Sequence, residues 1–182
     1  MGFFNRLFSK KQELLDPVDL GILNGDVHSH LIPGIDDGSP SMEVTIELLK
    51  KFISLGYKKI ITTPHVMSDY YLNTPEIINQ GLENIRKSIE ENQLEIKIEA
   101  AAEYNLEPSF EDLIKNKNLL TFGKDNFLLF ELSFFSEPQN LNEVIWSMRE
   151  AGYNPVLAHV ERYAYWHNDY DKVEEMVNRG VK

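Results

Sequence analysis

The chain has 182 residues, of which 42% are hydrophobic and 26% are charged, and this is enough for one domain with a sizeable core. Its net charge of -11 argues against a nucleic-acid backbone as partner. No apolar run is long enough to cross a bilayer. The sequence contains no cysteine, which excludes disulfides and thiolate ligands and, with no export signal, favours a cytoplasmic location.

Residues 1–21 are expected to form an N-terminal extension. The first eleven residues are rich in apolar and basic side chains but lack the apolar core and cleavage site of a signal peptide. Arg6 stands where a myristoylation motif needs Ser or Thr. We therefore favour a docking or frayed N-terminal segment over a membrane anchor.

From residue 22 onward, strand patterns alternate with helix patterns. The strands are expected at residues 22–30, 58–65, 95–104, 127–132 and 155–160. Ser39-Pro40 and Thr74-Pro75 resemble helix starts, a third helix is expected over Pro108–Asn116, and two more end at Gly152 and Gly180. This alternation predicts an α/β fold with a mostly parallel sheet, with residues 22–182 as one domain.

Residues that commonly bind metals recur at the carboxyl ends of the expected strands. His28 and His30 lie two residues apart in the first strand, so both imidazoles project from one face. The next four strands end in His65, Glu103, Glu131 and His159. Because the carboxyl ends of the strands of a parallel barrel surround one mouth, we expect these side chains to converge there.

Each of these residues alone has an ordinary explanation, such as a packed core histidine, a loop cap or an ion-pair partner. Their repetition strand after strand favours a metal site instead. A mixed imidazole and carboxylate set without sulfur suits Mn²⁺, Fe²⁺ or Zn²⁺, and it is too large for one ion. We expect two or three ions and a hydrolytic reaction.

Five segments of the chain resemble a known family. H-S-H-L-I-P-G-I-D-D-G, T-P-H-V, A-A-E-Y, F-E-L and A-H-V-E-R-Y are similar to motifs of the polymerase and histidinol phosphatase (PHP) family. They are most similar to its bacterial manganese-dependent protein-tyrosine phosphatases, which are linked to capsular and exopolysaccharide synthesis. The resemblance implies a distorted TIM-like (βα)7 barrel, of which this sequence holds about the first five βα units and the start of the sixth.

The resemblance also implies roles for individual residues. It implies that the metal ligands are His28, His30, Asp37, His65, Glu103, Glu131 and His159. Asp36 is expected to be a turn residue rather than a ligand. Arg162 matches an arginine that the family presents to the phosphate, and its alternative is an ion pair with Glu161 or Asp169. Glu103 and Arg162 are the expected catalytic residues.

The sequence departs from the family pattern at its end. The family uses a further D-x-H pair after a sixth βα unit, and this sequence ends at Lys182 without it. We expect either that the chain continues in a longer protein or that a partner supplies these ligands.

The expected function is metal-dependent hydrolysis of phosphomonoesters, with a metal-bridging hydroxide as nucleophile. The implied substrate is a phosphotyrosine protein, such as a tyrosine kinase of polysaccharide synthesis. A phosphatase for small molecules such as histidinol phosphate, and a truncated non-catalytic metal-binding partner, remain the alternatives. Whether the chain forms a homo-oligomer stays open. Several aromatic residues after strand ends could flank a substrate ring or simply pack: Tyr70, Tyr71, Phe134, Phe135, Tyr163 and Trp166.

Overall fold

Short strands alternate with helices along the chain, in a computed structural model that describes residues 20–182. The strands are β1 (Gly25–Ser29), β2 (Lys59–Thr62), β3 (His65–Val66), β4 (Lys97–Ala100), β5 (Glu103–Asn105), β6 (Phe127–Glu131) and β7 (Asn154–Leu157). The α-helices are α1 (Met42–Ser54), α2 (Pro75–Glu91), α3 (Pro108–Asn116), α4 (Leu141–Glu150) and α5 (Tyr170–Asn178). Three 3-10 helices complete the set: η2 (Leu20–Leu23), η3 (Val160–Arg162) and η4 (Ala164–Trp166). The docking or frayed segment expected at the N-terminus lies outside the described residues, and of the extension expected over residues 1–21 only residues 20 and 21 are described.

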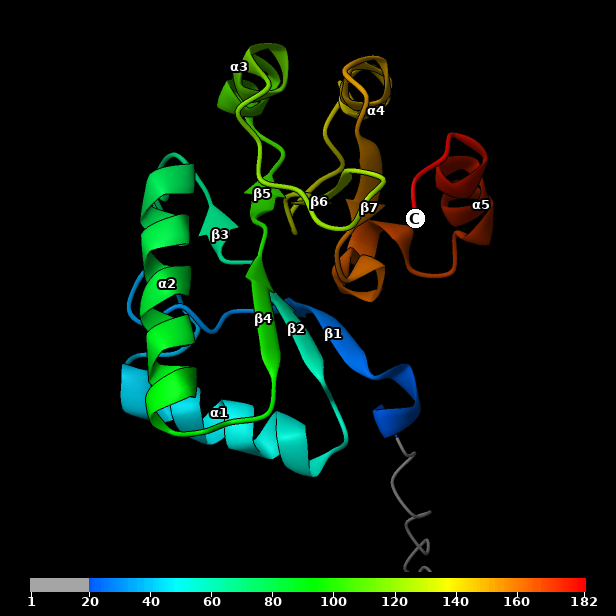
Figure 1. Ribbon diagram of the computed structural model, residues 1–182. Coiled ribbons are helices and arrows are strands. Elements are labelled where there is room, and N and C mark those ends of the chain that lie inside the picture. The colour runs from blue at the N-terminus through cyan, green and yellow to red at the C-terminus, as the bar shows by residue number, and fades with distance from the viewer. Residues whose placement is uncertain (1–19) are drawn as a thin grey trace, which may run out of the picture.

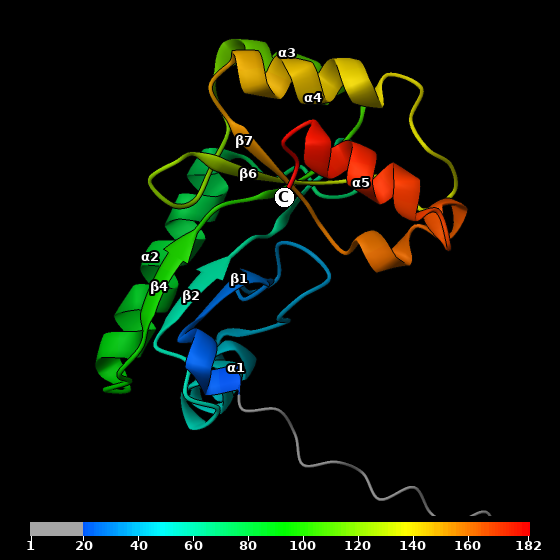
Figure 2. The same cartoon turned by 90° about the vertical axis from the view of Figure 1, so that its right-hand side faces the viewer.

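The described strands form two parallel sheets (Figures 1 and 2). One contains three strands in the order β1-β2-β4, and the other contains four in the order β3-β5-β6-β7. Every strand pairing within both sheets is parallel. The predicted α/β class with parallel strands is therefore confirmed.

Two of the predicted strands are each broken in the middle, and this break creates the two sheets. The strand predicted over residues 58–65 divides into β2 and β3, because Pro64 has no N–H for a ladder hydrogen bond. The strand predicted over residues 95–104 divides into β4 and β5 around two fully buried alanines, Ala101 and Ala102. The prediction of two continuous strands was wrong.

The ends of other elements also differ from the sequence prediction. The first strand begins at Gly25 rather than residue 22, because η2 precedes it, and the last ends at Leu157 because η3 follows. Helix α1 is capped by Ser41 rather than Ser39: the Ser41 hydroxyl accepts from the Val44 N–H, whereas Ser39 is buried. Helix α2 begins as predicted, with Thr74 as cap and Pro75 in its first turn.

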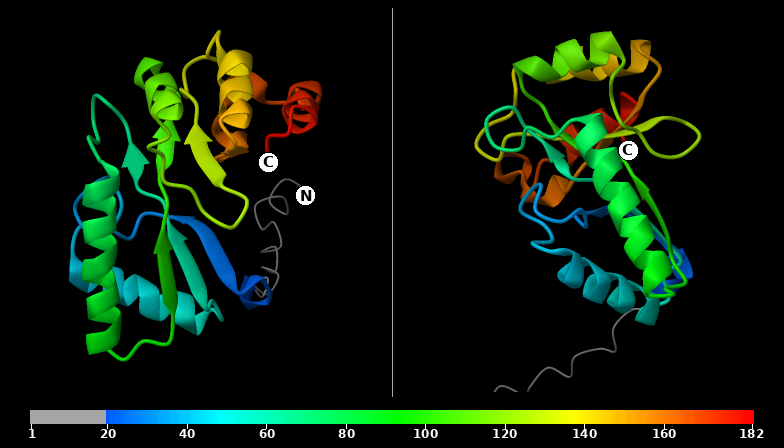
Figure 3. Two further views of the ribbon diagram at one scale, coloured as in Figure 1. Left: turned by 45° about the horizontal axis from the view of Figure 1, so that its top comes forward. Right: turned by 60° about the vertical axis from the view of Figure 1, so that its left-hand side comes forward.

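The helices divide between the two sheets (Figures 1 and 3). Helix α2 packs against β4 and also contacts α1. Helices α3 and α4 contact each other beside the four-stranded sheet, where α4 packs on β7, and α5 lies next to η4. Within residues 20–182, none of the helices has the length and apolar character needed to cross a membrane.

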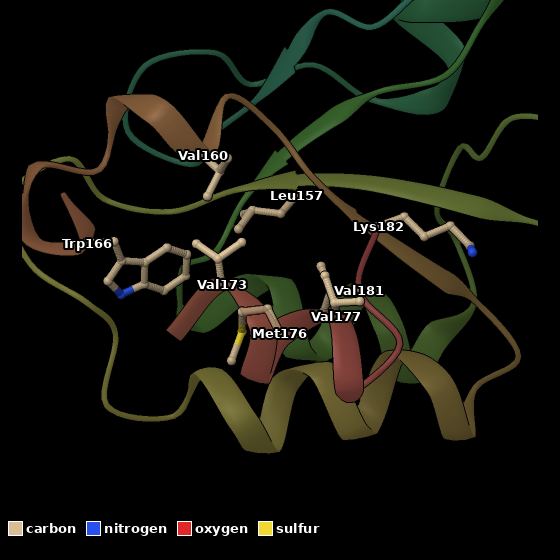
Figure 4. A pocket seen from close by; sticks show the side chains of 8 residues that line it. All are labelled: Leu157, Val160, Trp166, Val173, Met176, Val177, Val181 and Lys182. Carbon is tan, nitrogen blue, oxygen red and sulfur yellow. The ribbon is translucent and has the colours of Figure 1, made fainter. Parts of the chain in front are cut away.

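An apolar pocket of about 110 Å³ lies between β7, η4 and α5 (Figure 4). Leu157, Trp166 and Met176 are among the side chains that line it. At its edge the Lys182 backbone pairs with β7, since its N–H donates to the Pro155 carbonyl and its carbonyl accepts from the Leu157 N–H. The pocket contains none of the predicted metal ligands.

Candidate metal centre

The predicted ligands gather at the junction of the two sheets. Strands β2 and β4 end at Thr62 and Ala100, and after breaks of two residues β3 and β5 begin at His65 and Glu103, which are paired in register. Glu131 is the last residue of β6, and His159 follows β7. The breaks thus place His65 and Glu103 at strand starts, not at the strand ends that we predicted.

Glu103 lies at the middle of this group. Its side chain is fully buried, and one carboxylate oxygen, Oε2, lies 3.3 Å from Nε2 of both His28 and His30 and 3.1 Å from His65 Nδ1. The other oxygen, Oε1, lies 2.9 Å from His159 Nε2. A single buried carboxylate is therefore surrounded by four imidazoles from three separate segments.

Glu131 and Asp37 extend the group on either side of His65. The Glu131 side chain is almost fully buried, and its Oε1 lies 3.2 Å from His65 Nδ1. Asp37 is exposed, and its Oδ1 lies 3.5 Å from His65 Nε2. Within the described chain the donor atoms form three overlapping groups, each within 4.8 Å: His28, His30 and Glu103; His30, Asp37 and His65; His65, Glu103 and Glu131.

The charges of the centre are strongly coupled. Burial raises the pKa of the Glu103 carboxyl, but contacts with His159, His28 and His30 outweigh burial and hold that pKa well below its usual range. Burial lowers the pKa of His30, yet Asp36 and Glu103 raise it to about 9. Because its pKa is raised, His30 holds a proton more tightly than a free imidazole when no cation is present, and a cation must displace that proton to bind.

The donor set fits divalent cations. Three buried atoms that face one another have no hydrogen-bond partner among the described residues: His65 Nδ1, Glu103 Oε2 and Glu131 Oε1. Leaving each buried polar atom unsatisfied costs about 1–3 kcal/mol, and coordination would satisfy all three. Imidazole nitrogens with carboxylate oxygens are the donors that Mn²⁺, Fe²⁺ and Zn²⁺ accept.

Asp36 has a role that the sequence analysis missed. Its side chain is fully buried and its Oδ2 lies 2.7 Å from His30 Nδ1. The same oxygen accepts from the His65 backbone N–H at 3.1 Å, and Oδ1 accepts from the Gly38 N–H. Asp36 thus orients His30 from behind, as carboxylates do for metal-binding histidines. A Cβ on Gly38 would collide with His30, so the turn needs glycine there.

His159 adopts an unusual backbone conformation. Its φ is +33°, in the left-handed region that residues other than glycine rarely occupy, and it caps the start of η3. This conformation turns the chain sharply after β7 and lets Nε2 reach Glu103. Backbone strain of this kind is common at functional sites.

Arg162 lies at the rim of the centre rather than in an ion pair. Its guanidinium carbon is 5.0 Å from the centroid of the Phe134 ring, and that ring is 5.6 Å from the ring of His159. Among the described residues no ion pair joins Arg162 to Glu161 or Asp169, and Asp169 instead caps α5.

The aromatic residues named from the sequence separate into two groups. Tyr163 and Trp166 are buried and hydrogen-bonded, to Ala158 and Glu137 respectively, so they belong to the packing. Tyr71 stacks on His65 with ring centroids 5.4 Å apart, and Phe134 borders His159. Tyr70 and Phe135 are strongly exposed, so they do not belong to the packing.

Comparison with known proteins identifies the family. The family described as capsular polysaccharide synthesis, CpsB/CapC, matches residues 24–182. The chain belongs to the CpsB/CapC family. CapC of Staphylococcus aureus is 28% identical to this CpsB/CapC chain over 156 residues, which cover 86% of this chain and 61% of CapC. Tyrosine-protein phosphatase YwqE of Bacillus subtilis (strain 168) is 24% identical over 156 residues, with the same coverage of each chain.

A solved structure supports the same fold. It comes from work on YwqE of Bacillus subtilis and CpsB of Streptococcus pneumoniae, described as metal-dependent tyrosine phosphatases. The match has a TM-score of 0.79 at 23% identity and covers 86% of this chain and 64% of that one. The CpsB/CapC chain described here thus spans between 61% and 64% of the length of these relatives.

Proposed function

We propose that this CpsB/CapC chain acts in the metal-dependent hydrolysis of phosphotyrosine in proteins, in capsular or exopolysaccharide synthesis. The observation that carries the proposal is the buried Glu103 carboxylate, which four imidazoles face at 2.9–3.3 Å. The relatives are named as tyrosine-protein phosphatases, and their names indicate the substrate class.

The proposed ligands are those on which the geometry converges: His28, His30, Asp37, His65, Glu103, Glu131 and His159. We propose two or three Mn²⁺ ions, with Fe²⁺ or Zn²⁺ as other suitable occupants. When bound, such ions supply positive charge for the phosphoryl oxygens and lower the pKa of water.

The protein's own residues prepare the site for a phosphoryl group. Glu103 and Glu131 are buried carboxylates that would hold the cations. Asp36 fixes the ring of His30, and Arg162 places a permanent positive charge at the exposed rim, where it would bind phosphate oxygens. A tyrosine phenolate leaves with a pKa of about 10, so it needs less protonation than an alkyl alcohol.

The substrate would be a phosphotyrosine protein such as a tyrosine kinase of polysaccharide synthesis. Because protein kinases use ATP as a substrate, we propose that the kinase and this phosphatase meet in the cytoplasm. We further propose that residues 22–182 form a single metallophosphatase domain.

The test compares two glutamates from strands that follow each other in the chain, β4 and β5. Glu103→Gln should lower Mn²⁺ affinity by more than about 100-fold, because even residues that only hydrogen-bond to a metal ligand contribute about 10–100-fold to metal affinity. Glu99→Gln is the matched control, since Glu99 is half-exposed and pairs with Lys59 on the sheet surface. Bound metal is measured by elemental analysis, and hydrolysis is measured with a phosphotyrosine peptide and a small alkyl phosphate.

We expect the parent and Glu99→Gln proteins to bind Mn²⁺ and to prefer the peptide. Full metal content in Glu103→Gln, or peptide hydrolysis that survives exhaustive chelation, would contradict the proposal. A preference for the alkyl phosphate would contradict the substrate class alone.

A further inference from the structure

Phe134 presents an apolar surface at the edge of the candidate metal centre. It lies three residues after Glu131, in the loop that follows β6, and its side chain is 43% exposed. Its ring centroid is 5.6 Å from that of His159 and 5.9 Å from that of Tyr163, onto which it stacks at an interplanar angle of 24°. The ring is therefore held in place and yet partly open to solvent.

Arg162 lies against the same ring, 5.0 Å from its centroid. The Phe134 ring thus lies against both the Arg162 guanidinium and the His159 ring. The arginine can bind an anion. Covering the exposed part of the ring with an apolar group is also favourable, because it removes apolar surface from water. Together they are complementary to a ligand that joins a phosphate directly to an apolar ring.

We propose that Phe134 is a specificity-determining residue that contacts the aryl group of the substrate and selects aryl over alkyl phosphate esters. The inference rests on the proposed phosphatase function and adds to it the residue that contacts the aryl leaving group. In an aryl phosphate a single ester oxygen separates ring and phosphorus, so a phosphate beside Arg162 and His159 brings its ring next to Phe134. A short alkyl group offers little surface for this contact.

The neighbouring residue provides a matched control. Phe135 has the same side chain in the same loop, is 96% exposed and has no aromatic or cation–π partner among the described residues. A change at Phe135 removes the same number of atoms from the loop without touching the centre. Aromatic pairs of this kind are worth a preference of about two- to tenfold.

The experiment measures binding of two stable phosphate mimics to the Mn²⁺-loaded protein by calorimetry. Phenylphosphonate and methylphosphonate differ only in the group on phosphorus, so their affinity ratio isolates the contact with the ring. We expect the parent and Phe135→Ala proteins to bind phenylphosphonate about fivefold more tightly, and Phe134→Ala to bind both ligands about equally. If the substitution displaces Arg162, the affinity for both ligands falls to the same extent and their affinity ratio is unchanged.

An unchanged ratio in Phe134→Ala, an equal fall in Phe135→Ala, or a parent ratio near one with both ligands bound would overturn the inference alone. Failure of both ligands to bind the parent protein would overturn the proposed function and the inference with it. If Phe134→Ala does not hold Mn²⁺, the pair Phe134→Leu and Phe135→Leu gives the same comparison with less loss of packing.

Discussion

At the scale of single residues, the site depends on carboxylates that are buried and still charged. Glu103 stays ionised in a place without solvent because imidazoles face both of its oxygens. The Asp36 carboxylate lies behind His30 and links its ring to the backbone N–H of Gly38 in the following turn. The candidate ligands could be recognised in the sequence, because histidine and glutamate are unusual in apolar strands. The sequence did not reveal which of Asp36 and Asp37 has the buried side chain, because the geometry of the turn determines this.

Asp36→Asn should weaken metal binding without removing a ligand. An amide at this position has a less favourable interaction with the His30 ring, and such supporting partners contribute about 10–100-fold to metal affinity. The measurement is a Mn²⁺ titration of the variant beside Asp69→Asn, a change at an exposed residue of the loop after β3. Equal affinities in the two variants would show that Asp36 serves only the turn.

At the scale of elements, breaks in the strands build the centre. Sequence pattern predicted two long strands, since residues 58–65 and 95–104 are rich in apolar and β-branched side chains. The first break could have been expected from Pro64, which cannot donate to a ladder. The second falls at two small buried alanines, which carry no local signal, and only the neighbouring strands determine it. The helix starting at Thr74-Pro75 was predictable because its cap is a local feature.

Tyr163 joins the ends of two strands that carry proposed ligands. Its hydroxyl accepts from the Leu132 N–H at 3.0 Å and donates to the Ala158 carbonyl at 3.1 Å, next to Glu131 and His159. Tyr163→Phe should lower the free energy of unfolding by about 1–3 kcal/mol, because a buried N–H loses its partner.

Chemical denaturation measures this effect, with Tyr170→Phe as control because that ring is 79% exposed. Equal stability of the two variants would mean that the hydroxyl does not hold the strand ends together. A loss of metal affinity in Tyr163→Phe alone would show that this link also positions the ligands.

At the scale of the whole molecule, two parallel sheets meet end to end and the candidate centre lies where they meet. The sequence predicted the class of fold and the convergence of the candidate ligands, since parallel strands with regular spacing share one edge. It did not predict two sheets, because their separation arises from packing between distant segments. Closure of the strands into a barrel remains a prediction.

The most direct test of this account is anomalous diffraction from crystals of the protein grown with Mn²⁺. The account predicts peaks within coordination distance of the Glu103 carboxylate, with His28, His30, His65 or His159 completing the coordination. Manganese bound only at other sites, with Glu103 left uncoordinated, would contradict the central claim.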